Sequence, residues 1–202
     1  MIRTLTVGVL AVLFSAGCMG KTQLAKYYTL RPIDKVETSA SMVAMDDLAV
    51  GIGPIKFPDE LDRNAIVTSS GPTQLEVNEF HRWGGSLESN VIRVLQENLS
   101  LLLRTNRVMS RPWEGYFNPD IRVALDIRQF DGRLGKLASL NATWTLINPD
   151  TASHIHTQRT FIQQDVSDNS YDALVEAQSL ALAGLCREIA VVISDIYGQQ
   201  KK

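Results

Sequence analysis

Apolar and polar residues alternate along two successive stretches of this chain, residues 121–128 and 138–146. A period of two places alternate side chains on opposite faces of a β-strand, so both stretches are predicted to be half-buried strands. Asp131-Gly132 is predicted to turn the chain between them, and Asn148-Pro149-Asp150 leads into a third strand at about residues 155–162. Three successive strands joined in this way form an antiparallel meander.

Two long stretches with helical spacing flank the meander. The first begins after Ser86, a natural N-cap, and continues to about Arg104. The second begins after Asp168-Asn169-Ser170 and ends near Gly198. Each is predicted to be an amphipathic helix whose apolar stripe packs in the domain. The residues at helical spacing are Leu87, Val91, Val94, Leu95, Asn98, Leu99 and Leu102 in the first helix, and Leu174, Leu182, Leu185, Ile189, Val192, Ile193 and Ile196 in the second.

Shorter strands are predicted before the first helix. Residues 48–53 have the composition of a buried strand that ends at Pro54. Residues 65–68 and 74–77 flank a turn sequence and predict a hairpin, and residues 27–30 predict a short strand at the domain edge. Two long helices and five or six strands together indicate a mixed α/β domain.

The N-terminal segment has the features of a secretory signal. Arg3 supplies a positive charge, residues 5–14 are mostly apolar, and the small residues 15–17 precede Cys18. Such a run is too short to cross a bilayer as a helix, which needs about 20 residues. The segment resembles the bacterial lipobox, in which the signal is removed just before an acylated cysteine; an ordinary secretory signal is the alternative. We expect residues 1–17 to be a signal peptide and Cys18 to be the lipid attachment site.

Residue 19 bears on which membrane holds the anchor. In Gram-negative lipoproteins an Asp after the cysteine is the usual signal for retention in the inner membrane, and here the residue is Met19, so we expect the outer membrane. Two or more acyl chains make such an anchor stable. Residues 18–46 include Pro32 and the small, polar residues 38–41, a composition that suits a tether. Residues 47–198 are then expected to form a single α/β domain.

Composition and the remaining cysteine and histidines narrow the class of function. The net charge of −2 gives no basic surface for nucleic acid, so we expect no nucleic-acid partner. Cys186 has apolar neighbours and is predicted to be a buried structural thiol. His154 and His156 could share a metal on one face of a strand, but the spacing offers no third ligand. Two solvent-facing histidines are the favoured interpretation.

A catalytic site would need a nucleophile with a base, a carboxylate pair or a set of metal ligands, and none is found in the sequence. Gly51-x-Gly53 lacks the third glycine and the following helix of a dinucleotide site, so it is interpreted as the end of a strand. We therefore expect a non-enzymatic protein that needs no metal or cofactor. The alternative function of a periplasmic hydrolase would be supported if mutating His154 and His156 abolished function without unfolding the protein.

A series of short motifs runs from residue 50 to residue 103, behind the predicted lipobox. They are Val50-Gly51-Ile52-Gly53-Pro54-Ile55, Phe57-Pro58-Asp59-Glu60-Leu61-Asp62-Arg63, Ile66-Val67-Thr68, Leu75, His81-Arg82-Trp83 and Val94-Leu95-x-x-Asn98-Leu99, with Tyr27-Tyr28-Thr29-Leu30 before them. In this order they resemble the ABC-type transport auxiliary lipoproteins, the PqiC-like family. The likeness extends over nearly all of the mature chain.

The resemblance implies a periplasm-facing lipoprotein that accompanies an MCE-domain (mammalian cell entry) protein and its ABC transporter, which move lipid between the two membranes. It also implies a three-layer α/β/α domain around a mixed sheet of about five strands. The role expected from it is structural: acylated Cys18 holds the domain at the outer membrane, and the domain docks the periplasmic partner. A homo-oligomer around that partner is a further expectation.

Two loop segments are predicted to form the docking surface, because loops carry function more often than helix stripes do. The candidate partner-binding residues are Pro58, Asp59, Leu61, Asp62, Arg63, Arg82 and Trp83. Trp83 is open to two interpretations, an aromatic anchor in an interface or a lid that closes the helix end onto the core. From charge alone, the charged residues Asp59, Glu60, Asp62 and Arg63 of the first loop are interpreted as solvated surface, and part of a partner-binding edge is the alternative. The alternative function is a periplasmic lipid-binding carrier, which would need an apolar cavity inside the domain.

Overall fold

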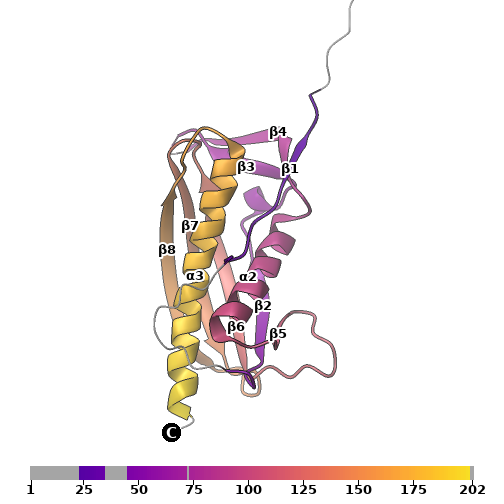
Figure 1. Cartoon of the computed structure of the whole chain (residues 1–202), viewed down its shortest axis with the longest axis vertical. Helices are drawn as coiled ribbons and strands as arrows, with labels where there is room; N and C mark the ends of the chain where they lie inside the picture. The colour runs from indigo at the N-terminus through magenta and orange to yellow at the C-terminus, as the bar shows by residue number, and fades with distance from the viewer. Residues whose placement is uncertain (1–22, 35–44, 72, 201–202) are drawn as a thin grey trace, which may run out of the picture.

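The computed structural model describes residues 23–34, 45–71 and 73–200. Its elements in chain order are β1 (Lys26–Tyr28), β2 (Val50–Lys56), the 3-10 turn η2 (Asp59–Leu61), β3 (Ala65–Ser69), β4 (Leu75–Trp83), α2 (Leu87–Leu103), β5 (Val108–Ser110), β6 (Ile121–Gly132), β7 (Leu137–Ile147), β8 (His154–Asp165) and α3 (Tyr171–Gln200). Figure 1 shows the two long helices lying along an elongated sheet. None of the helices in the described ranges combines the length and apolar character that a membrane crossing requires.

The larger sheet has five strands in the order β5-β2-β6-β7-β8. Strand β2 is parallel to both β5 and β6, whereas β6, β7 and β8 are successively antiparallel. The predicted meander is therefore confirmed, and the sheet is mixed. Leu125 of β6 pairs with Trp144 of β7, and both side chains are buried, as the alternating pattern predicts.

The predicted turn at Asp131-Gly132 is wrong by a few residues. Both residues belong to β6, where they pair with Ser139 and Ala138, and the chain turns only after them. A Cβ atom at Gly132 would lie 2.6 Å from Leu174 Cδ1 of α3 and 2.8 Å from a backbone oxygen of β7. This glycine is thus needed because α3 approaches the strand closely, and a glycine in a strand interior often has that role.

The prediction that the strand after residue 48 ends at Pro54 is also wrong, because β2 continues to Lys56. The pairing of β2 with β6 shifts register between Ile52 and Ile55, so Pro54 lies in an irregular part of the ladder. A proline has no backbone N–H to donate and is tolerated in a sheet where the pairing is interrupted. Gly51-x-Gly53 therefore lies inside a strand, with no helix directly after it.

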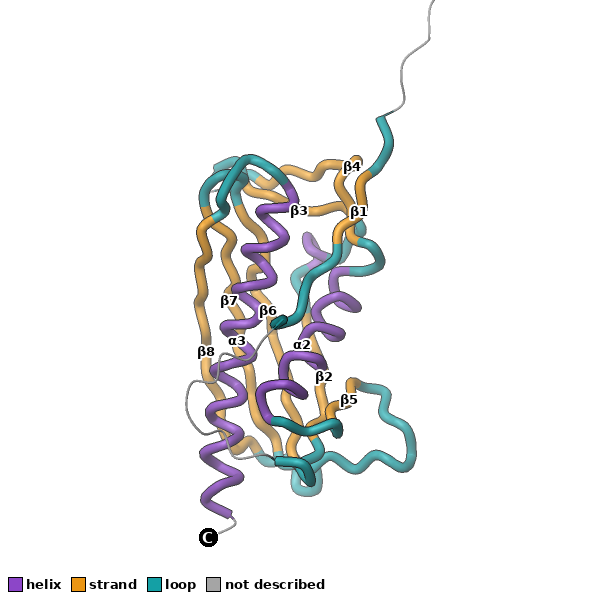
Figure 2. Tube along the Cα trace, in the orientation of Figure 1, coloured by secondary structure: helices purple, strands orange, loops and turns teal. Residues whose placement is uncertain are grey.

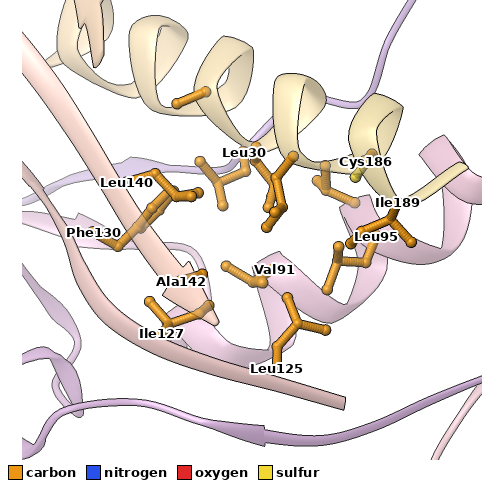
Figure 3. Close-up of a cluster of buried hydrophobic side chains, with 14 of the residues drawn as sticks. Leu30, Val91, Leu95, Leu125, Ile127, Phe130, Leu140, Ala142, Cys186 and Ile189 are labelled. Carbon is orange, nitrogen blue, oxygen red and sulfur yellow. The ribbon is translucent and has the colours of Figure 1, made fainter. Parts of the chain in front are cut away.

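Both helices pack on the same face of the five-stranded sheet and against each other. Helix α2 contacts β2 and β5, and α3 contacts β6, β7 and β8. Figure 3 shows side chains of β6, β7, α2 and α3 converging on a common core. Its buried members include Leu95, Ile127, Phe130, Leu140 and Ile189. Burying an apolar side chain of this size stabilises the fold by about 1.5–3 kcal/mol.

The opposite face of this sheet carries mainly polar side chains, together with the exposed Phe161 of β8. Thr145 and Thr157 are joined by a 3.1 Å hydrogen bond between their hydroxyl groups, and Arg159 Nε donates to Asn141 Oδ1 over 3.0 Å. Polar, partly exposed side chains are typical of a sheet face that water covers. Since the helices share one face, the expected three-layer α/β/α arrangement is not confirmed; a mixed α/β fold is what the described residues form.

A second sheet of three strands, in the order β1-β4-β3, lies at one end of the molecule. Strands β3 and β4 are antiparallel, which confirms the predicted hairpin, and β1 joins β4 in parallel. The short strand predicted at residues 27–30 is thus confirmed as β1. Figures 1 and 2 show that the described chain begins at this end, just before β1, and that the C-terminal end of α3 lies at the other.

Candidate functional site

Residues 29–33 form what we call the N-terminal strap, which follows β1 and lies between α2 and α3 (Figure 2). Side chains of both helices accept hydrogen bonds from its backbone. Asn90 Oδ1 accepts from Leu30 N over 3.3 Å, Asn98 Oδ1 accepts from Ile33 N over 2.8 Å, and Ser179 Oγ accepts from Arg31 N over 3.1 Å. A segment without a sheet or helix of its own is thereby supplied with backbone partners.

The strap is also tied to the domain by packing and by an arginine. The Leu30 side chain is 1% exposed and belongs to the main core. Arg93 Nη2 of α2 donates to Leu30 O and to Thr29 Oγ1, over 2.5 and 2.9 Å. The expected tether of residues 18–46 therefore needs correction: residues 26–33 are packed on the domain, and residues 35–44 and everything before Gln23 lie outside the described residues.

An aromatic cluster fastens the start of the strap to the second sheet and to α3. The His81 ring of β4 stacks on the Tyr171 ring, with centroids 3.8 Å apart. The Tyr28 hydroxyl lies 2.7 Å from His81 Nδ1. Burial, then the charge of Asp172, raises the pKa of Tyr28, so its hydroxyl stays protonated. Three elements that are distant in the sequence meet at this cluster.

We expect the stability of the domain to fall with acidification through His81. Burial, and next the charge of Lys26, lowers the pKa of His81 from its ordinary 6.5, while Asp172 opposes the shift. A lowered folded-state pKa means that the unfolded chain binds the proton first. The stability that neutral His81 contributes is therefore present above pH 6.5 and is lost as the pH falls through the lowered value.

Urea unfolding of the wild type and of His81→Gln at several pH values between 7.5 and 5 measures this effect. The free energy of unfolding of the wild type should decline with pH more steeply than that of the variant. His154→Gln, on β8 in the other sheet, is the matched control and should retain the wild-type slope. Equal slopes for the wild type and His81→Gln would contradict the assignment.

A surface groove of about 560 Å³ lies between the strap and α3. Its apolar lining includes Tyr27, Val175 and Leu180, and its charged lining is Arg31, Asp34, Asp172, Glu176 and Arg187. The volume is within the range of small-molecule sites, but charges of both signs line it. Sequence reasoning missed this groove because residues 18–46 were interpreted as a tether. The short strand predicted at residues 27–30 indicated that this segment packs at the domain edge, but not that the chain continues between the helices.

The structure brings the two predicted docking segments together. Trp83 N donates to the carbonyl oxygen of Asn64 over 2.7 Å, so the end of β4 lies beside the loop that follows η2. Leu61 and Trp83 are only 5% and 3% exposed. Of the two interpretations of Trp83, the lid on the core is therefore the one that the structure supports.

The other candidate docking residues differ in exposure. Asp59, Asp62 and Arg63 are exposed, whereas Pro58 and Arg82 are half-buried. Arg82 forms a salt bridge within its own strand, since its Nη2 lies 2.7 Å from Glu79 Oε2. A docking surface at this place would thus consist of the charged residues, with the apolar ones beneath them.

The two histidines of β8 do not form a metal site in the described part of the chain, where no group of three potential ligands is found. His154 is exposed. His156 is half-buried and packs beside the Trp144 ring, and its Nε2 lies 3.2 Å from Gln158 Oε1. Of the two histidines predicted to face solvent, His154 does so fully and His156 only in part.

The remaining thiol is predicted to be unreactive in the folded protein. Cys186 is fully buried, and burial raises its pKa to about 12. Asn98 Nδ2 donates to its sulfur over 3.6 Å. With position 18 acylated or replaced, Cys186 should react with an aromatic disulfide reagent about 1,000-fold more slowly in the native state than in urea. Rapid reaction of the native protein would show that the site is accessible.

Comparison with known proteins identifies relatives of the whole domain. The family described as "ABC-type transport auxiliary lipoprotein component" matches residues 28–190. A crystal structure of an uncharacterized protein superposes with a TM-score of 0.68 at 19% identity, covering 84% of this chain and 99% of the other. A protein from Xanthomonas campestris superposes with a TM-score of 0.67 at 16% identity, covering 87% and 99%. No curated protein matches the sequence.

Proposed function

Because the chain belongs to the family of ABC-type transport auxiliary lipoproteins, we propose that it is a non-enzymatic accessory component of an ABC/MCE-type lipid transport system. In this proposal, acylated Cys18 holds it in the inner leaflet of the outer membrane, with the domain in the periplasm. The domain docks the MCE-domain protein that reaches across the periplasm. The family match over residues 28–190, behind a lipobox-like segment, is the observation that carries the proposal.

The way in which the strap is held supports a docking role. Side chains of α2 and α3 accept hydrogen bonds from the backbone of residues 30–33 and fix them on the domain, so only a short length of chain would separate the acylated residue from a docked partner's site. A long flexible tether would not do this, because its end-to-end distance fluctuates. The proposed function is therefore that of a rigid adaptor at the membrane.

The charged surface beside η2 is the proposed contact with the partner. Asp59, Asp62 and Arg63 are exposed next to the buried Leu61 and Trp83, which fix the loop from below. Exposed charges at an interface contribute mainly to orientation and to the rate of encounter. The lipid-binding carrier is the weaker alternative, since the groove described above is open at the surface and lined by five charged side chains.

The first test compares the full-length protein with its Cys18→Ala variant after expression in a Gram-negative host. The wild type should have an acylated N-terminus at residue 18 by mass spectrometry and should fractionate with the outer membrane. The variant should lose both properties. An unmodified wild-type N-terminus would contradict the anchor.

The second test addresses docking. An MCE-domain protein, identified by mass spectrometry, should co-purify with the detergent-extracted wild-type protein. Exchanging two exposed charges, Asp62→Lys with Arg63→Glu, should reduce that recovery by about tenfold, the size expected when several interface charges are reversed. Arg159→Glu, at an exposed position on β8, is the matched control and should leave recovery unchanged. If the double variant still co-purifies with as much of the MCE-domain protein as the wild type does, the interface lies elsewhere.

A further inference from the structure

A group of exposed apolar side chains lies around β1 and β4, at the end of the molecule where the described chain begins. Among the described residues, five of the twelve large apolar side chains with high exposure belong to β4 or to the segment around β1. They are Leu24, Tyr27, Leu75, Val77 and Phe80, which are 85%, 67%, 46%, 39% and 39% exposed. We call them the anchor-end residues. Figures 1 and 2 show β3, β4 and β1 together at this end.

The length of the chain before β1 limits how far these residues can lie from a membrane anchor. Leu24 is six residues after Cys18, which corresponds to at most about 20 Å of extended chain. Lys26, the first residue of β1, is at most about 28 Å from it. Helix α3, with 30 residues and a length of about 45 Å, extends from this end toward the opposite one. An acyl chain on Cys18 therefore keeps the β4 end, not the far end, beside the bilayer.

We propose that the anchor-end residues contact the lipid surface in which the acylated protein is held. This inference rests on the acylation of Cys18 proposed above. Tyr and Phe side chains favour the boundary between headgroups and acyl chains, and leucine and valine gain from burial there. The domain is then seated on the bilayer by β4, instead of hanging free from its anchor.

The charges around β4 indicate which lipid chemistry this face fits. Lys26 and Arg82 carry two positive charges, and Glu76 and Glu79 carry two negative ones, so the face has no net charge. Anionic headgroups attract clusters of basic residues, and no such cluster is present among these four. The contact is therefore apolar and suits a neutral, zwitterionic surface, and it should depend little on salt or on anionic lipid.

The test uses the full-length acylated protein in vesicles of phosphatidylcholine, with or without phosphatidylglycerol. An environment-sensitive fluorophore is attached at Val77→Cys, and the buried Cys186 is left in place. A quencher fixed in the lipid should reduce the fluorescence of this label severalfold. The reduction should be the same in both vesicle types and at high salt. A label at Tyr116→Cys, in the exposed loop between β5 and β6, is the control and should not be quenched. Phe80→Cys replaces Val77→Cys if that variant folds poorly.

Three results would overturn the inference. The first is absence of quenching at positions 77 and 80 in protein whose N-terminus is shown by mass spectrometry to be acylated. The second is a spectral shift that grows with protein density without lipid quenching, which would mean that a second copy covers this face. The third is a shift that needs an added partner protein. A non-acylated N-terminus would instead contradict the proposed function, so the two failures are distinguishable.

Discussion

Replacement of Asn98 by leucine should lower the free energy of unfolding by at least about 1–3 kcal/mol, although the two side chains have the same number of heavy atoms and the same branching. Asn98 is fully buried in α2, and its Oδ1 accepts a hydrogen bond from Ile33 N of the strap over 2.8 Å. Leucine offers no acceptor, so this backbone N–H would be left without a partner in the protein interior, which costs that amount. Urea unfolding measures the loss, and hydrogen exchange at the Ile33 amide locates it.

The exchange measurement separates loss of the strap from general destabilisation. In Asn98→Leu, the Ile33 amide should exchange faster by a larger factor than the amides of β7, because the strap opens before the sheet does. Leu101→Ala is the matched control, since this residue of α2 is 45% exposed and should change stability by less than about 0.5 kcal/mol. Equal acceleration at Ile33 and in β7 would contradict the idea that Asn98 acts on the strap.

Truncation of Trp144 to alanine should cost about 3–5 kcal/mol of folding free energy, the range for large aromatic residues removed from a core. Trp144 lies in β7, is 0% exposed, and donates from Nε1 to Thr160 Oγ1 over 3.0 Å. The Thr160 hydroxyl in turn donates to Glu188 of α3 over 2.6 Å. The indole thus packs in the core and also takes part in the hydrogen bonds that join β7 and β8 to α3.

Two further variants separate packing from hydrogen bonding at Trp144. Trp144→Phe keeps most of the apolar volume and should cost less than the alanine variant. Thr160→Val removes the hydroxyl while keeping the shape, and it should cost about 1–3 kcal/mol because the indole N–H and the Glu188 carboxylate each lose a partner. Thermal unfolding should place Trp144→Ala lowest in melting temperature. A loss below about 1 kcal/mol for Trp144→Ala would mean that the neighbouring chains close the cavity.

Helices and strands with a strong apolar periodicity could be predicted from the sequence. The meander, α2 with its Ser86 cap, and α3 follow from patterns that depend on one element at a time. Ser86 Oγ accepts from Ser89 N over 3.0 Å and Ser170 Oγ accepts from Ala173 N over 3.1 Å, as N-cap residues do.

Features that depend on contacts between distant segments could not be predicted in the same way. Gly132 was interpreted as a turn residue because nothing local reveals that α3 passes over it. The placement of both helices on one face follows from packing between the helices, which their separate apolar stripes do not specify. The strap was missed because its few apolar residues are interrupted by Arg31 and Pro32, and because its backbone partners are side chains more than 50 residues away.

The candidate site was predicted in part. The sequence placed the two docking segments as separate motifs, and the structure brings them into contact through Trp83 and Asn64. Burial of Leu61 and Trp83 removes these two candidates from the surface, whereas Asp59, Asp62 and Arg63 stay exposed. Sequence patterns assign residue type and period, but exposure at a junction between a loop and a strand end depends on the whole fold. Their partner-binding role stays a prediction.

The course of β1 and the strap has a mechanical consequence. Residues 23–33 run from the end of the molecule that holds β1 and β4 toward its middle, so a pull on residue 23 away from the domain is directed along β1 (Figure 1). Such a load shears the hydrogen bonds to β4 and those to Asn90, Asn98 and Ser179 together, and does not open them one after another. The joint thus resists traction as a unit, so a force between the proposed acyl anchor and a docked partner would be carried without unravelling the domain.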